Sequence, residues 1–428
     1  EKENGIQFSE NQRRAVSEAV QRGLLVITGG PGTGKTTIIN CILSLLGKDV
    51  LLAAPTGRAA KRMSEATGHE AKTLHRLLEF AGEEGKFQRD EQNPLDAACV
   101  IVDEMSMVDV FLMRALLRAL RPGTRLLLVG DTDQLPSVGA GNVLGDILQS
   151  GVIPSVRLTD IFRQSEESLI VLNAHRINHG EAPVLNRKDS DFFFERQPFA
   201  EDAARAIVGL CGKRLPAFLH TDRPARDIQV LSPTRKAGAG VHQLNAMLQA
   251  ALNPPAPWKQ EIVYGSTVFR TGDKVMHVRN NYQLPWKMDD GEEGEGVFNG
   301  DVGFVEKVDA EDRVVTVRYD EERTVEYDYQ MLEEVELAYC LSVHKSQGSE
   351  FPCVVMPVVG GPPRLLTRNL FYTALTRARK LVVLVGREDC IAAMVQNNHI
   401  ATRYTLLTQR LQENLGTPVH ISWPEEQR

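Results

Sequence analysis

Residues 24–36, LLVITGGPGTGKT, decide the fold of this chain. An apolar run typical of a buried strand leads into the pattern G-x-x-x-x-G-K-[ST], and the segment from Thr36 to Leu46 has the apolar spacing of a helix. Glycines let backbone N–H groups surround phosphate oxygens, and the helix N-terminus adds partial positive charge. This order of strand, loop and helix predicts a site for a nucleoside triphosphate.

The loop provides phosphate contacts and one ligand for magnesium. We expect the Lys35 ammonium to reach the β- and γ-phosphates and the Thr36 hydroxyl to bind Mg²⁺. The predicted nucleotide-binding residues of this segment are Gly30, Gly32, Thr33, Gly34, Lys35, Thr36 and Thr37. The sequence has no guanine-reading N-K-x-D after a strand, which argues against a GTPase and leaves ATP as the expected nucleotide.

Apolar strands that alternate with helical segments recur along the chain. They lie at 50–54, 99–102, 126–129, 228–231, 354–358 and 381–385. Nearly continuous apolar strands between helices are typical of parallel sheets that are covered on both faces. The sequence therefore predicts an α/β fold with two lobes, each of which presents its ligand-binding residues at the carboxyl ends of its strands.

Two stretches interrupt this alternation. Residues 80–94 are polar and contain glycine, which fits either a short β-hairpin or a plain loop. Residues 254–334 contain two β-branched runs separated by a turn, which predicts a hairpin within a small antiparallel barrel. The expected domains are a first lobe at 1–150, a second lobe at 151–253 and 335–428, and this β insertion.

Polar residues follow two further strands of the first lobe. Asp103 and Glu104 end the strand at 99–102, where Asp103 is placed to hold Mg²⁺ and Glu104 to act as the base that aligns the attacking water. Gln134 follows the next strand and is a candidate sensor of the γ-phosphate. The carboxyl ends of parallel strands meet at one edge, so we expect these side chains near Lys35.

The composition limits the remaining possibilities. No apolar run approaches the ~20 residues of a membrane helix, and the six cysteines form no C-x-x-C pair, which argues against zinc or a disulfide framework and fits the cytoplasm. A net charge of −7 means that nucleic acid would have to bind through a local basic groove. The chain begins at Glu1 without methionine, which we interpret as a fragment of a longer protein.

The ordered motifs resemble those of superfamily 1 helicases, specifically the RecD-like group that moves 5′→3′ on DNA. The resemblance covers nearly the whole chain. Its matching segments are 8–12, 29–36, 54–60, 73–75, 103–104, 130–137, 158–164, 232–235, 344–351 and 372–379. It implies two RecA-like P-loop NTPase lobes with a small hairpin in the first and an SH3-like β-barrel inserted in the second.

The resemblance also implies roles for individual residues. It assigns catalysis to Lys35, Glu104, Gln134, Arg163 and Arg377. It adds Gln12, Gly348 and Glu350 to the nucleotide site, and Thr36 with Asp103 to the metal site. It implies contacts with single-stranded DNA for Pro55, Thr56, Arg58, Thr73, His75, Ser137, Asn142, Thr234, Arg235, His344, Lys345 and Ser346.

Three functions remain open at this point. The first is an ATP-dependent 5′→3′ DNA helicase, the second is an RNA-directed helicase, and the third is an ATP-gated nucleic-acid-binding module that does not unwind. The 2′-hydroxyl distinguishes RNA from DNA, and the sequence does not show whether the groove accepts or excludes it. The complete catalytic set counts against the third function. His75 and His344 are equally open to a structural role in the core or at a helix cap.

The expected partners follow from the same resemblance. They are single-stranded DNA and duplex junctions, and repair proteins that bind through the absent amino-terminal region. We expect a monomeric motor with ATP and Mg²⁺ as cofactors and no membrane association. Related helicases place a strand-separating wedge after the second DNA-gripping segment, and Phe87 is the expected aromatic residue at its tip.

Overall fold

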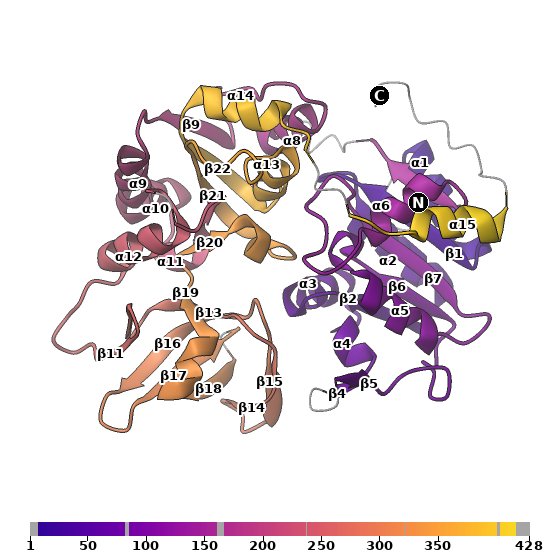
Figure 1. Ribbon diagram of the computed structural model, residues 1–428, viewed down its shortest axis with the longest axis horizontal. Coiled ribbons are helices and arrows are strands. Elements are labelled where there is room, and N and C mark those ends of the chain that lie inside the picture. The colour runs from indigo at the N-terminus through magenta and orange to yellow at the C-terminus, as the bar shows by residue number, and fades with distance from the viewer. Residues whose placement is uncertain are drawn as a thin grey trace. The chain divides into compact units, whose positions relative to one another are not determined.

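The computed structural model describes residues 7–81, 85–160, 167–236, 238–320, 322–399 and 403–416 (Figure 1). The chain forms two compact units. The first contains residues 1–171 and 400–428, and the second contains residues 172–399. Each unit has its own parallel sheet, as the alternation of apolar strands and helices predicts.

The first unit is built on a six-stranded parallel sheet with the order β3-β2-β6-β7-β1-β8. The four strands expected from the apolar runs are present. The strands are β1 (Leu24–Gly29), β2 (Val50–Ala54), β3 (Ala71–Thr73), β6 (Cys99–Val102), β7 (Arg125–Gly130) and β8 (Ser155–Leu158). The phosphate loop follows β1, which lies between β7 and β8.

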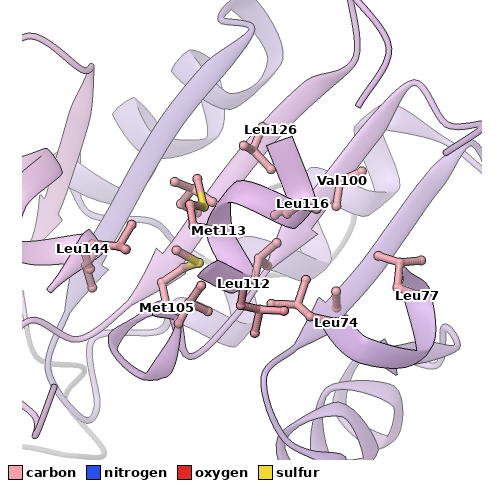
Figure 2. Close-up of a cluster of buried hydrophobic side chains, with 14 of the residues drawn as sticks. Leu74, Leu77, Val100, Met105, Leu112, Met113, Leu116, Leu126 and Leu144 are labelled. Carbon is pink, nitrogen blue, oxygen red and sulfur yellow. The ribbon is translucent and has the colours of Figure 1, made fainter. Parts of the chain in front are cut away.

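Helices cover both faces of this sheet because neighbouring strand residues point to opposite sides. One face packs on α1 (Glu10–Gln21), α2 (Lys35–Leu46) and α3 (Gly57–Thr67). The other packs on α4 (Leu74–Leu77), α5 (Val110–Ala119) and α6 (Val143–Ser150), as Figure 2 shows for Leu116 and Leu144. Leu25 and Ile27 thus face one core, while Val26 between them faces the other.

The structure corrects the predicted boundary between the two lobes. Strand β8 was expected in the second lobe, but it pairs in parallel with β1 of the first unit. Helix α15 (Leu407–Leu415), also assigned to the second lobe, packs on α6 of the first. Only alternate residues of the edge strand β8 are buried. The strand therefore does not need the continuous apolar run of the central strands, and its sequence gives no sign that it belongs to this sheet.

Residues 80–94 contain the hairpin rather than the plain loop. Strands β4 (Phe80–Ala81) and β5 (Lys86–Phe87) pair antiparallel, with Phe80 opposite Phe87. Phe87 lies in β5 and is partly buried, and its role as the aromatic residue at the tip of a wedge stays a prediction. Its ring lies 4.9 Å from that of Phe80 and 5.8 Å from that of His75, and it packs against the core because burying its apolar surface is favourable.

The second unit contains a five-stranded parallel sheet with the order β20-β10-β21-β22-β9. Its strands are β9 (Phe192–Arg196), β10 (Ile228–Ser232), β20 (Cys340–Ser342), β21 (Phe351–Val358) and β22 (Ala378–Gly386). Its helices are α8 (Leu169–Asn178), α9 (Ala200–Gly209), α10 (Leu215–Leu219), α11 (Pro224–Asp227), α12 (Val241–Leu252), α13 (Arg368–Leu375) and α14 (Glu388–Gln396). Helices α9 and α12 share a core with the sheet.

The β insertion is a seven-stranded antiparallel sheet with the order β15-β14-β18-β17-β16-β13-β19 and a separate β11–β12 hairpin. Its strands are β11 (Glu261–Tyr264), β12 (Thr267–Arg270), β13 (Lys274–His277), β14 (Asn281–Met288), β15 (Glu293–Val297), β16 (Val302–Asp309), β17 (Val314–Tyr319), β18 (Arg323–Asp328) and β19 (Val335–Leu337). The predicted hairpin is therefore confirmed as β17 and β18.

A buried carboxylate ties this insertion to α12. Asp273 accepts hydrogen bonds from Gln249 at 2.6 Å, Asn253 at 2.7 Å and the Tyr339 hydroxyl at 3.0 Å. These donors satisfy a carboxylate that burial would otherwise penalise.

Candidate nucleotide and DNA sites

The phosphate loop has the backbone that its glycines predict. Gly32 and Gly34 have φ angles of 73° and 81°, a region that other residues rarely adopt. The Lys35 ammonium donates to the carbonyls of Gly29 at 2.6 Å and Gly30 at 3.0 Å, and the Thr33 hydroxyl donates to Gly30 at 2.8 Å. The ammonium is thus held within the loop, and the loop opens directly into α2.

Gln12 lies against the same loop. It belongs to a capping box with Ser9 at the start of α1, and its Nε2 donates to the Thr33 carbonyl at 2.9 Å. The structure therefore brings Gln12 together with the phosphate loop, as the glutamine motif requires. Its contact with adenine stays a prediction.

Asp103 and Glu104 follow β6, next to β2 and β7 in the sheet. Burial, followed by the charge of Glu104, raises the pKa of Asp103, whereas Arg62 and Lys35 oppose the rise. Glu104 has a φ of 54°, a left-handed conformation that is costly for a non-glycine residue and often found at functional sites.

The residues predicted for magnesium suit that ion chemically. Mg²⁺ is held by hard oxygen donors, commonly one or two carboxylates together with phosphate oxygens. The Thr36 hydroxyl and Asp103 carboxylate are such donors, and a cation would offset the burial that raises the Asp103 pKa. Within the described residues, no group of three or more His, Cys, Asp or Glu side chains forms a separate metal site.

Gln134 is held at the end of β7. Its Nε2 donates to Asp131 at 3.3 Å, and Asp131 also accepts from the Asp133 backbone. Its Oε1 atom is buried and accepts no hydrogen bond from any group in the described part of the chain. An amide that is fixed on one side and unsatisfied on the other is suited to detecting a ligand.

The predicted DNA segments of the first unit follow the neighbouring strands β2 and β3. Thr56 accepts from the Ala59 amide at 3.3 Å and begins α3, and Thr73 accepts from the Arg76 amide at 3.1 Å and begins α4. Pro55 and Arg58 flank the first of these caps. Both hydroxyls therefore have structural roles as helix caps. Because β2 and β3 are neighbours, the two segments that follow them lie at the same edge of the sheet.

His75 is partly buried beside the β4–β5 hairpin. Its ring contacts Phe80 at a centroid distance of 5.6 Å, and burial lowers its pKa despite the opposing charge of Asp109. A neutral ring packed against two aromatic side chains matches the structural alternative left open for this residue.

Ser137 lies in a turn that contacts Arg403, a residue far away in the sequence. Its hydroxyl lies 3.3 Å from the Gly139 carbonyl and 3.2 Å from that of Gly141. Arg403 donates to the same two carbonyls at 2.5 and 2.7 Å and to the Ser137 hydroxyl at 3.3 Å. Asn142, the next residue in the chain, occupies the N-cap position of α6 but makes no side-chain capping hydrogen bond. No sequence motif marks Arg403, because its partners lie more than 260 residues away.

The DNA candidates of the second unit follow the paired strands β10 and β20. Arg235 and Lys345 share one carboxylate, since Glu336 accepts from Arg235 at 3.1 Å and from Lys345 at 2.8 Å. Burial alone would raise the Glu336 pKa, but its bonds with Lys345 and Arg235 leave that pKa below its ordinary value. Sequence reasoning missed Glu336, which lies on β19, the edge strand of the insertion's sheet.

The other candidates in this group are less accessible. Thr234 is buried beside Ser232, whose hydroxyl donates to the Thr234 carbonyl at 3.1 Å. Burial lowers the pKa of His344. Ser346 is fully buried and donates to the Val343 carbonyl at 2.8 Å, so its predicted DNA contact conflicts with this structure.

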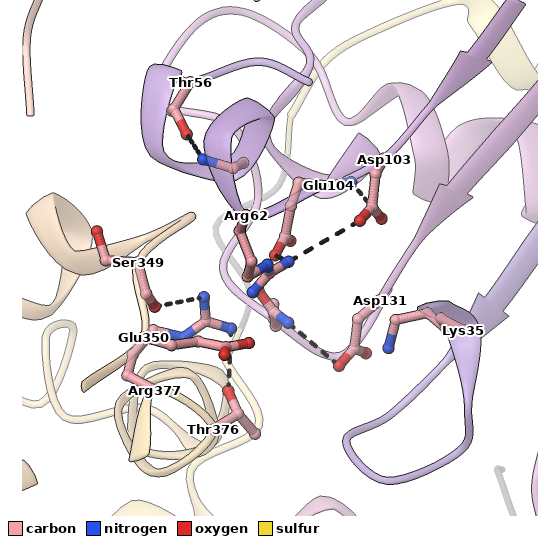
Figure 3. A network of polar contacts seen from close by, with 12 residues as sticks. Lys35, Thr56, Arg62, Asp103, Glu104, Asp131, Ser349, Glu350, Thr376 and Arg377 are labelled. Carbon is pink, nitrogen blue, oxygen red and sulfur yellow. Dashed lines mark hydrogen bonds and ion pairs between the residues drawn. The ribbon is translucent and has the colours of Figure 1, made fainter. Parts of the chain in front are cut away.

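The nucleotide candidates of the second unit lie around the end of α13. Arg377 donates to the carbonyls of Thr373 and Ser349, each at 3.2 Å, and to the Thr376 hydroxyl at 3.3 Å. Gly348 has a φ of 72°, and Glu350 binds Arg379 at 2.7 Å. Arg163 lies outside the described residues. Figure 3 shows the contact from Arg377 to Ser349.

Comparisons with known proteins agree with these features. Models of an AAA domain, an ATP-dependent RecD-like DNA helicase SH3 domain and a UvrD-like helicase C-terminal domain match residues 12–140, 244–319 and 337–385. The chain is 34% identical over 437 residues to the RecBCD enzyme subunit RecD of Mycolicibacterium smegmatis, covering 94% of this chain and 75% of that protein.

The chain belongs to the RecD-like helicase family. It is also 38% identical over 409 residues to the ATP-dependent RecD2 DNA helicase of Deinococcus radiodurans, covering 94% of this RecD-like chain but 52% of that protein. The chain thus spans about half the length of that relative.

The matching family models and the similar solved structures together confirm the fold, which has two RecA-like lobes and an SH3-like insertion. The Bacteroides Pif1 helicase complex with ADP-AlF3 and ssDNA has a TM-score of 0.53 and 20% identity, with 95% and 98% of the two chains covered. Pif1 helicase from Candida albicans has a TM-score of 0.51 and 21% identity, with 96% and 99% covered. These similarities concern the fold alone. None of the described helices has the length and apolar character to span a membrane.

Proposed function

We propose that this RecD-like chain is the motor of an ATP-dependent helicase that steps 5′→3′ along single-stranded DNA. The observation that carries the proposal is the order of one sheet. It places the phosphate loop after β1, Glu104 after β6 and the Thr56 segment after β2, all at the carboxyl edge. Nucleotide hydrolysis and DNA contact would then act on the same rigid sheet.

The chemistry required of the first unit is ATP hydrolysis. The attacking water forms a bond to the γ-phosphorus, its proton passes to Glu104, and the bond to the ADP oxygen breaks. Lys35 and the loop amides balance charge on the phosphate oxygens. Thr36 and Asp103 would hold Mg²⁺, which neutralises further phosphate charge when bound.

Further cations would complete the proposed catalytic set. Family membership supports Arg377 and Arg163 as the arginines that stabilise the transition state, and Gly348 and Glu350 as nucleotide-binding residues. A correctly placed arginine is worth about 10³–10⁵ in rate in such enzymes. Arg235 and Lys345 would contact DNA phosphates, with binding that weakens as salt rises.

Strand displacement tests this function directly. A duplex is offered with a 5′ single-stranded tail, a 3′ tail or no tail, and unwinding with Mg²⁺ and ATP is measured for the wild-type chain and Glu104→Gln. We expect unwinding of the 5′-tailed duplex alone and none by the variant. Unwinding from the 3′ tail alone would refute the direction. Stimulation of the ATPase by oligo-U but not by oligo-dT would favour the RNA-directed alternative.

A further inference from the structure

Arg62 on α3 binds the candidate catalytic carboxylate. Its Nη2 donates to Glu104 Oε1 at 2.8 Å and lies 3.9 Å from Asp103 Oδ2 (Figure 3). Glu104 is largely buried, so solvent screens this charge-assisted bond only weakly. Arg62 lies beyond the motif that resembles the helicase family, which ends at Ala60.

We propose that Arg62 is a positioning residue that restrains Glu104 and couples DNA binding to ATP hydrolysis. The inference rests on the proposed function. A general base must present an available oxygen to the water whose proton it accepts. While the guanidinium occupies Oε1, Glu104 is held toward α3 and one of its acceptor positions is in use.

The position of Arg62 in α3 provides the link to DNA. Thr56, within the segment predicted to grip single-stranded DNA, is the N-cap residue of the helix, and Arg62 is six residues further on, about 9 Å along the axis. Ala59, Ala60 and Met63 are buried on the inner face of the helix. Movement at the DNA end would therefore be transmitted to Arg62 by a packed helix.

Glu104, in contrast, is anchored to the sheet. Strand β6 pairs in parallel with β2, and the Asp103 amide continues the pairing by donating to the Ala53 carbonyl at 2.9 Å. The Glu104 amide in turn donates to Asp103 at 2.8 Å. A shift of α3 by about 1 Å relative to this strand would lengthen the 2.8 Å bond beyond hydrogen-bonding range. DNA binding at Thr56 can thus release the carboxylate.

The test is the ATPase rate of the full chain without DNA and with saturating oligo-dT, for wild type, Arg62→Ala, Arg62→Lys and Lys61→Ala. Lys61 is an exposed cation on the same helix and serves as the matched control. We expect Arg62→Ala to raise the DNA-free rate roughly tenfold while the saturated rate stays within about twofold. Arg62→Lys should be intermediate, because an ammonium keeps the charge but not the planar donor geometry.

The outcomes distinguish a failure of the proposed restraint of Glu104 by Arg62 from a failure of the proposed helicase function. A DNA-free rate that is unchanged or lower in both Arg62 variants would overturn the restraint, provided that wild type is stimulated by oligo-dT. Circular dichroism checks that the variants fold, and Arg62→Lys alone decides the matter if the alanine variant does not. If wild type shows no stimulation by either oligo-dT or oligo-U, the proposed function itself fails, and the restraint with it.

Discussion

Glu336 should weaken the binding of single-stranded DNA because it competes with phosphate for Arg235 and Lys345. Its two carboxylate oxygens bind these cations at 3.1 and 2.8 Å. Glu336→Gln keeps the size of the side chain and removes its charge. We therefore expect tighter DNA binding, with both cations available to the backbone of the nucleic acid.

The structure sets the size of the effect. The side chains of Arg235 and Glu336 are 51% and 41% exposed and that of Lys345 is 25% exposed, so each ion pair is worth roughly 0.5 kcal/mol. Loss of both pairs should then tighten Kd about fivefold. Each additional single-strand phosphate contact steepens the dependence of log K on log salt by about 0.7, or about 1.4 for two.

Fluorescence anisotropy with labelled oligo-dT, at KCl concentrations from about 50 to about 200 mM, measures both Kd and the slope of log K against log salt. Glu333→Gln is the matched control, because Glu333 lies nearby in sequence and binds Arg279 instead, at 2.6 Å. Weaker binding by Glu336→Gln, or an unchanged salt slope, would show that Arg235 and Lys345 do not contact the DNA backbone.

Three further outcomes are expected. Burial lowers the pKa of His277 to about 4 despite the opposing charge of Glu334. Because this folded-state pKa is below the unfolded value of 6.5, acidification from about 6.5 to 4 should lower the free energy of unfolding by about 3 kcal/mol, and urea unfolding of His277→Gln should show a smaller loss. Arg403→Ala should weaken oligo-dT binding about fivefold, since the Ser137 turn loses its donor, whereas equal affinity in filter binding would refute that role. Leu116→Ala should lower the free energy of unfolding by about 3 kcal/mol in urea titrations, because it opens a cavity in a fully buried core.

The parts of the candidate site that depend on consecutive residues could be predicted from the sequence. A glycine pattern between an apolar strand and a helix specifies a phosphate loop, because positive φ angles and an open helix N-terminus are properties of consecutive residues. The central strands and the acids after β6 were predictable for the same reason, since burial on both faces requires continuous apolar runs.

Tertiary structure alone decided the features that depend on distant partners. Strand β8 joins the first sheet by pairing with β1, the partly buried Phe87 packs against the core, and Arg403 contacts the Ser137 turn from a distant part of the sequence. Glu336 likewise meets Arg235, which lies 101 residues earlier in the chain. Spacing along the chain carries no information about such contacts, because hydrogen bonds and ion pairs depend on distance in space rather than on separation in sequence.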